Sequence, residues 1–73
     1  MAELKHEIKK PLGVLSTSNR GWSKELNFVS WNDKEARYDL REWSNDHERM
    51  GKGITLTTEE MKALKEILSN VEI

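Results

Sequence analysis

The chain has 73 residues, of which 34% are charged and none is cysteine, and its formal net charge at pH 7 is −1. This length supports one domain with a small core, which such chains commonly complete with a disulfide, a metal ion or a partner chain. The composition excludes disulfides and thiolate metal sites, and the near-neutral charge argues against a strongly basic protein that binds nucleic acid in bulk. His6 and His47 lie far apart, so we expect no metal and no cofactor, and oligomerisation as the way to complete the core.

Four segments alternate between apolar and polar residues and therefore predict β-strands. The first, at 7–16, contains Pro11, which cannot donate to a strand ladder and so indicates an edge strand or a bulge. Two further segments follow at 22–31 and 36–43, and a short one at 53–56. Turn-forming residues separate the segments, at 16–21, 32–35 and 44–53.

The last part of the sequence predicts an amphipathic helix. Thr57 and Glu60 have the spacing of a capping box, in which each side chain accepts a hydrogen bond from the other residue's backbone N–H. Apolar residues follow at helical spacing: Met61, Leu64, Ile67, Leu68 and Val71. We therefore expect a single domain, residues 1–73, of the α+β class, with a four-stranded antiparallel sheet followed by one C-terminal helix (β-β-β-β-α).

One helix cannot cover both faces of such a sheet. The other face must be solvated, paired with a second subunit or reserved for a ligand. Because the helix offers more apolar surface than one small sheet needs, we expect a homodimer whose interface contains the five apolar helix residues named above.

Cationic and aromatic side chains alternate along the second and third predicted strands. They are Lys24, Phe28, Arg37, Arg41 and Trp43. On one exposed sheet face, the cations would follow phosphates while the rings stack on unpaired bases, a combination typical of proteins that bind single-stranded nucleic acid. Lys52, between Gly51 and Gly53, is a further candidate phosphate contact, because glycine lets the backbone approach an anion closely.

The same residues also fit structural roles. Arg37 and Arg41 flank Asp39, a pattern equally typical of solvated surface charges. Trp43 fits a dimer interface, where tryptophan is enriched. The two glycines beside Lys52 fit a simple bend.

Other polar and aromatic residues have a structural explanation on the sequence alone. Trp31 and Tyr38 share the strand parity of neighbouring aliphatic residues, so we expect them in the core. His6 is close to the terminus, so we expect it to be frayed, and His47 lies in a polar segment, so we expect it to be solvated. No cysteine nucleophile is present and no serine lies in a nucleophile-elbow motif, so we expect no enzymatic activity.

The stretch YDLREW at 38–43, followed by GKGITL at 51–56 and the helix, resembles the C-terminal domain of the positive cofactor four family of transcriptional coactivators. The resemblance is strongest to the short bacterial YdbC-like members, which consist of that domain alone. Together with GVLS, RGW and ELNFVSW, it extends over nearly the whole chain.

This resemblance implies a four-stranded antiparallel sheet, a C-terminal helix that drives homodimerisation, and binding of single-stranded DNA across curved β-surfaces with little sequence preference. The basic and aromatic strand residues of the family correspond here to Arg41, Trp43, Lys52, Lys24, Phe28 and Arg37. The family also places an aromatic residue in or near the second turn. Residues 32–36 contain none, and Phe28 or Trp22 would take its place.

The resulting hypothesis is a non-catalytic single-stranded DNA-binding protein, acting in transcription regulation or in the protection of exposed strands. RNA is a further possible ligand. An alternative of a different class is a protein-interaction adaptor that uses an exposed aromatic sheet face. Because the first ten residues lack the apolar core of a signal peptide and no apolar run is long enough for a membrane span, we expect a cytoplasmic protein.

Overall fold

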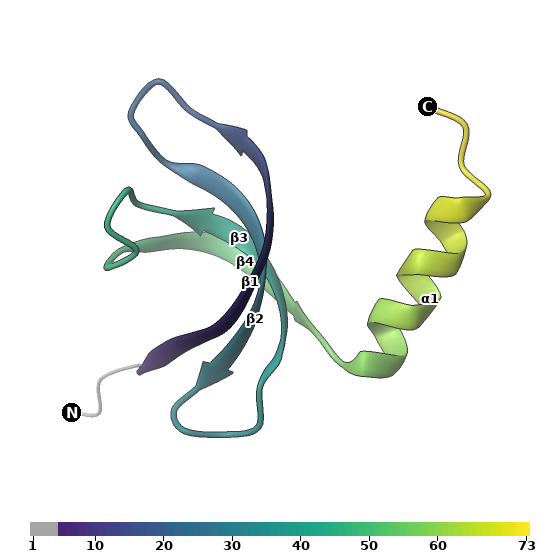
Figure 1. Cartoon of the computed structure of the whole chain (residues 1–73), viewed down its shortest axis with the longest axis horizontal. Helices are drawn as coiled ribbons and strands as arrows, with labels where there is room; N and C mark the ends of the chain where they lie inside the picture. Colours follow the sequence, from purple (N-terminus) through teal and green to yellow (C-terminus); the bar gives the residue numbers. More distant parts are fainter. Residues whose placement is uncertain (1–4) are drawn as a thin grey trace.

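The computed structural model describes residues 5–73 and contains one antiparallel sheet and one helix (Figure 1). The strands are β1 (His6–Thr17), β2 (Ser23–Trp31), β3 (Arg37–Trp43) and β4 (Met50–Leu56), and the helix is α1 (Thr58–Ser69). The strands follow one another in the order β1-β2-β3-β4, and each pair is antiparallel. The predicted α+β fold with a four-stranded antiparallel sheet and one C-terminal helix is thus confirmed.

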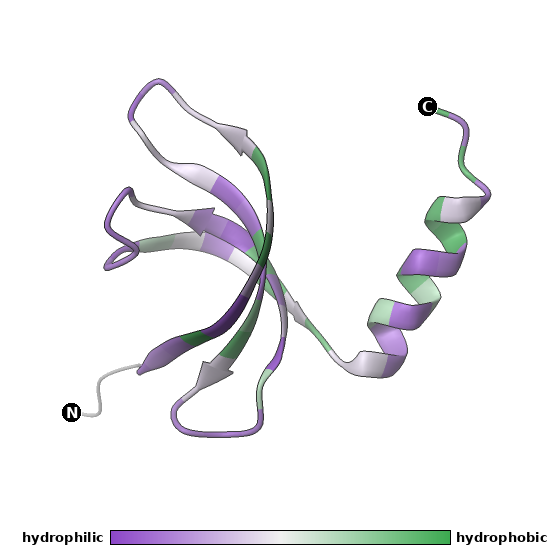
Figure 2. Cartoon of the chain, viewed as in Figure 1, coloured by the Kyte–Doolittle hydropathy of each residue, from purple (hydrophilic) through white to green (hydrophobic). Residues whose placement is uncertain are grey.

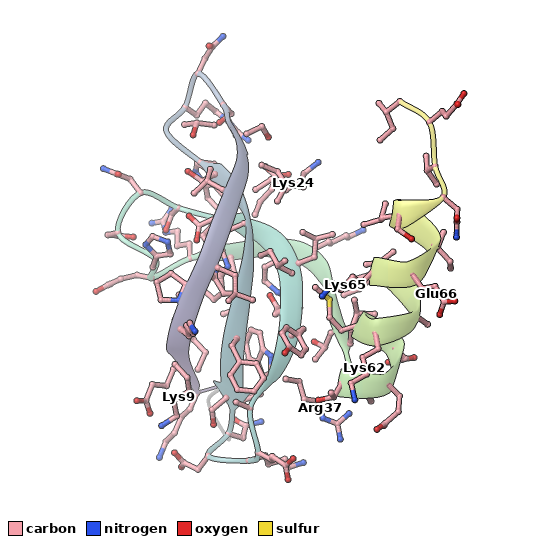
Figure 3. All side chains as sticks on the ribbon, turned by 45° about the vertical axis from the view of Figure 1, so that its right-hand side comes forward. Lys9, Lys24, Arg37, Lys62, Lys65 and Glu66 are labelled. Atoms are coloured by element: carbon pink, nitrogen blue, oxygen red, sulfur yellow. The ribbon has the colours of Figure 1, made fainter. Side chains whose placement is uncertain are left out.

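The register between β2 and β3 determines the two faces of the sheet. Glu25 pairs with Arg41 and Leu26 pairs with Leu40, so that odd-numbered residues of both strands share one face and even-numbered residues share the other. Figure 1 shows the sheet curving away from α1, and in Figure 3 Lys24 lies on the side of the sheet that faces the helix. We call the odd-numbered side the concave face and the even-numbered side the convex face.

The edge strand β1 is bulged three times. Its register against β2 shifts between Ile8 and Lys10, between Pro11 and Gly13, and between Val14 and Ser16, which leaves one unpaired residue in each interval. Bulges bend a strand and increase its twist, so they favour the curvature of this sheet. The proline lies on an edge strand and next to a bulge, between Pro11 and Gly13, as predicted.

The last strand is longer than predicted and includes the glycine pair. It begins at Met50, whereas the sequence placed residues 44–53 in a turn. Trp43 pairs with Met50 and Arg41 with Gly53, so two residues of β4 lie opposite Glu42 in a bulge. A Cβ atom on Gly53 would overlap the Cβ of Arg41 and the carbonyl oxygen of Leu40. Glycine is therefore required here because two backbones approach closely. Composition alone cannot distinguish such a glycine in a strand from a glycine in a loop.

The helix is capped as predicted but buries none of its residues against the sheet. Thr57 Oγ1 accepts from the backbone N–H of Glu60 at 3.1 Å, and Glu60 Oε1 accepts from the backbone N–H of Thr57 at 2.9 Å. None of the residues of α1 is buried, although Figure 2 shows hydrophobic segments along it. In residues 5–73 there is no helix with the length and apolarity needed to cross a membrane.

Candidate functional site

The register divides the predicted binding face between the two sides of the sheet. Lys24 pairs with Glu42 and Phe28 pairs with Tyr38, so both lie on the convex face. Arg37, Arg41 and Trp43 have odd numbers and lie on the concave face. The expectation that all five residues share one face is therefore wrong. A shift of one residue between β2 and β3 would have been needed to bring them together, and such a shift reverses the face of every side chain in a strand.

Trp43 is completely buried, at 0% exposure, which contradicts its expected position on an open face. Its ring centroid lies 4.9 Å from that of His6, 5.8 Å from that of His47 and 6.3 Å from that of Trp31, to which it is nearly parallel. The ring is thus covered by the first strand and by the loop after β3. Together with Val29, which is also at 0% exposure, it forms the core of the sheet on the concave side.

Both histidines contact the Trp43 ring. His6 begins β1 and is half-buried, so the expectation of a frayed end is wrong, whereas the His47 side chain is 41% exposed and retains the expected contact with solvent. His6 Nε2 donates to the carbonyl oxygen of His47 at 3.1 Å. His47, with a positive φ of 60°, places its own Nε2 2.9 Å from both carboxylate oxygens of Glu25. Glu25 is further held by Asn27 Nδ2, which donates to its Oε1 at 3.0 Å. These contacts tie the loop at 44–49 to β1 and β2 across the concave face.

Arg41 and Trp31 form the central aromatic–cationic pair of the concave face. The guanidinium carbon of Arg41 lies 4.9 Å from the centroid of the Trp31 ring, a cation–π distance. Arg41 Nε donates to Asp39 Oδ1 at 2.8 Å and its Nη1 donates to the carbonyl oxygen of Gly51 at 3.1 Å. Thr55 Oγ1 donates to the other carboxylate oxygen of Asp39 at 3.2 Å. The guanidinium orientation is therefore fixed by β3 and β4 on both sides.

Trp31 is a candidate site residue that the sequence interpretation missed, because its strand parity predicts a core position. It is partly exposed, unlike Trp43. It is the last residue of β2 and directly precedes the turn to β3. This position could have identified Trp31 from the sequence, because the family resemblance implies an aromatic residue in or near this turn. Tyr38, also expected in the core, is partly exposed on the convex face beside Phe28, with ring centroids 5.0 Å apart.

Lys24 and Lys52 come together at a second place. Both line a hollow of about 310 Å³, together with Leu40, Arg41, Glu42, Gly53 and Ile54. Lys24 belongs to the convex face and Lys52 to the β4 bulge opposite Glu42. Arg37 lies apart from both, as the exposed first residue of β3.

Trp22 lies at one end of the sheet, between two loops. Its ring is partly exposed, and the guanidinium carbon of Arg20 is 6.0 Å from its centroid. It lines a hollow of about 300 Å³ with Arg20, Ser44, Asn45, Asp46 and Arg49.

The apolar side of α1 lacks cover within the chain. Met61 and Leu64 are half-buried, whereas Ile67, Leu68 and Val71 are 60%, 54% and 46% exposed. All five residues belong to the predicted dimer interface. Figure 3 shows Lys65 on the side of the helix towards the sheet and Glu66 on the opposite side.

Comparison with known proteins gives two matches. Residues 18–67, which contain β2, β3, β4 and most of α1, match the model of the family described as Transcriptional Coactivator p15 (PC4). A protein of Treponema pallidum (strain Nichols), described as an uncharacterized protein, is 46% identical over 68 residues, which cover 93% of this chain and 80% of the relative.

Proposed function

Because the chain belongs to the transcriptional coactivator p15 (PC4) family, we propose that it is a non-catalytic protein that binds single-stranded DNA on the concave face of its sheet. The observation that carries this proposal is the Arg41–Trp31 pair, in which a half-buried tryptophan, with its Nε1 buried, lies beside a fixed guanidinium on that face. The cellular role that fits the family is regulation of transcription or protection of transiently exposed strands.

Single strands suit this face better than a duplex. An unpaired base can stack on the Trp31 ring, and such stacking contributes about 1–3 kcal/mol per base. A duplex keeps its bases stacked inside and offers a flat aromatic surface little to contact. Since stacking accepts every base, the concave face itself should show little sequence preference.

The proposed contacts differ in part from those expected from the sequence. Arg37 remains as the proposed phosphate contact, Arg41 positions the ring, and Trp31 takes the place of Trp43 as the stacking ring. Lys24 and Phe28 are not part of this concave site, because they lie on the convex face, whereas Lys52 lines a hollow with both Lys24 and Arg41 and stays a candidate phosphate contact.

We also propose that the protein is a homodimer formed through α1 and the convex face. Apolar side chains on both are exposed or half-buried, including Ile54 of β4 at 55% and Ile67 at 60%. The helix has few contacts with the sheet of its own chain, as its separation in Figure 1 indicates. A second copy would cover both surfaces and leave both concave faces open.

A salt titration with an unstructured oligonucleotide tests the proposed face. Arg37→Gln should flatten the plot of log affinity against log salt by about 0.7, because one phosphate contact is lost. Lys24→Gln is the matched control: it removes the same charge from the convex face and should leave the slope unchanged. A larger effect from Lys24→Gln would place the strand on the convex face, and duplex binding as tight as single-strand binding would contradict the proposal altogether.

One observation favours the alternative of a protein-interaction adaptor. The edge strand β1 exposes Leu12, Val14 and Leu15 at 41%, 61% and 59%. An apolar protein interface at this edge would depend weakly on salt, whereas phosphate contacts give a steep dependence. The same titration therefore separates the two functions, and a parallel titration with RNA of the same sequence identifies the preferred strand.

A further inference from the structure

A polar hollow lies at the end of the sheet where two hairpin loops meet. In an antiparallel sheet of order β1-β2-β3-β4, the first and third connections lie at the same end. Figure 1 shows both loops projecting from the sheet at that end. The hollow between them has a volume of about 300 Å³ and is lined by Arg20, Trp22, Ser44, Asn45, Asp46 and Arg49.

The two arginines of the hollow come from different loops. Among residues 5–73, neither Arg20 nor Arg49 forms an ion pair, unlike Arg41, which is paired with Asp39. The two guanidinium groups and the Asp46 carboxylate line the same hollow, so its formal charge is +1 and a phosphate beside the arginines would meet net positive charge. Guanidinium groups bind phosphate oxygens through a fork of N–H donors, so phosphate is the anion that this pair fits best.

The hollow also contains an aromatic surface and a hydrogen-bond acceptor. The Trp22 ring is partly exposed beside Arg20. Asp46 Oδ1 accepts from Ser44 Oγ at 2.7 Å and from the backbone N–H of Glu48 at 3.0 Å, whereas its Oδ2 has no hydrogen-bond partner among residues 5–73. The hydrogen bond from the Glu48 N–H, followed by that from Ser44, lowers the pKa of Asp46 below its usual value of 3.8, so this carboxylate is ionised at neutral pH.

We propose that this hollow is a nucleotide subsite that prefers a base with an exocyclic amino group. The base stacks on Trp22, its amino group donates to Asp46 Oδ2, and its phosphate lies between Arg20 and Arg49. Cytosine and adenine present such an amino group where thymine presents a carbonyl oxygen, which an ionised carboxylate repels. The inference rests on the proposed function, because the nucleotide belongs to the same single strand. It adds a base preference to the binding proposed for the concave face, which has little preference of its own.

The variant Asp46→Asn tests the acceptor without removing the loop. An asparagine Oδ1 can still accept from Ser44 and Glu48, while its Nδ2 replaces the acceptor Oδ2 by a donor. The measurement is the ratio of the dissociation constants of oligo(dT) and oligo(dC) of about 12 nucleotides, at mildly alkaline pH, where oligo(dC) stays unpaired. The loss of one negative charge raises the affinity for both oligonucleotides, and this common gain cancels in the ratio.

We expect Asp46→Asn to lower the ratio of the oligo(dT) dissociation constant to the oligo(dC) dissociation constant by about three- to tenfold. This is the effect of one hydrogen bond gained or lost. Asp33→Asn is the matched control, since it removes the same charge from an exposed turn at the other end of the sheet, at a residue whose positive φ of 62° suits asparagine. An unchanged ratio in Asp46→Asn, with strand binding intact, overturns the subsite and leaves the concave-face proposal standing.

Trp22→Ala gives a second, independent measurement. It should weaken oligo(dC) binding at least about fivefold and reduce the difference between the two oligonucleotides, because the base loses its stacking partner. Equal loss for oligo(dC) and oligo(dT) contradicts the preference, and no loss contradicts the subsite. If the wild-type protein binds neither oligonucleotide, the proposed function and this inference fall together.

Discussion

Arg41 lies with its guanidinium carbon 4.9 Å from the centroid of the Trp31 ring while its Nε donates a 2.8 Å hydrogen bond to Asp39. The Asp39 side chain is fully buried and that of Arg41 is 14% exposed, so the carboxylate largely offsets the charge of the cation. In the proposed function, Arg41 therefore holds the Trp31 ring in place, and the attraction of phosphates to the concave face comes from more exposed cations such as Arg37. A small number of exposed cations on this face is consistent with a chain whose net charge is −1.

The first prediction concerns the stacking ring. Trp31→Leu should weaken binding of a single-stranded oligonucleotide by about 1–3 kcal/mol, because leucine keeps apolar bulk against Arg41 but has no aromatic face. The salt dependence should stay as in the wild type, since no charge changes. Fluorescence anisotropy of a labelled oligonucleotide at several salt concentrations measures both quantities, and wild-type affinity in this variant would exclude Trp31 as a stacking contact.

The second prediction concerns the buried ring. Trp43→Ala should destabilise the fold by about 3–5 kcal/mol, the usual cost of deleting a large buried side chain. Trp43→Phe should cost much less, because the buried Nε1 of Trp43 has no hydrogen-bond partner among residues 5–73, and its removal relieves an unsatisfied donor. Urea denaturation of both variants checks the order. If Trp43→Ala keeps wild-type stability and loses DNA binding, the assignment of this ring to the core is wrong.

The contrast between these two tryptophans shows where sequence interpretation stopped. Strand alternation and the capping box were enough to predict the element order. They could not determine which residues of β2 oppose those of β3, because register depends on the turn at 32–36 and a shift of one residue reverses a face. The burial of Trp43 depends on His6 and His47, which are distant in sequence. The sequence of the β4 bulge likewise predicts a loop, because glycines are equally typical of a turn.

The third prediction concerns that bulge. Gly53→Ala should destabilise the fold by more than about 1 kcal/mol, since the new methyl group would overlap the backbone of β3. Gly13→Ala in β1 is the matched control, because a Cβ atom there meets nothing within 4 Å and the substitution should be neutral or slightly stabilising. Thermal melts of the two variants give the comparison, and equal melting temperatures would show that the strands separate at Gly53 without cost.

The fourth prediction concerns the assembly. Leu68→Glu should dissociate the proposed homodimer and lower its stability, because it places a charge on the apolar side of α1, where Leu68 is 54% exposed in the single chain. Sedimentation at several protein concentrations, together with thermal melts, follows dissociation and unfolding at once. In a dimer that shares its core, the wild-type melting temperature should also rise with protein concentration.

Ser69→Glu provides the matched control for this test. It introduces the same charge into the same helix, three residues after Glu66, which lies on the side away from the sheet. This variant should remain a dimer with nearly wild-type stability. If the wild-type chain sediments as a folded monomer of 8.5 kDa, or if both glutamates have the same effect, the apolar side of α1 is not the dimer interface. Single-strand binding by such a monomer would still support the concave face, because its contacts all come from one chain.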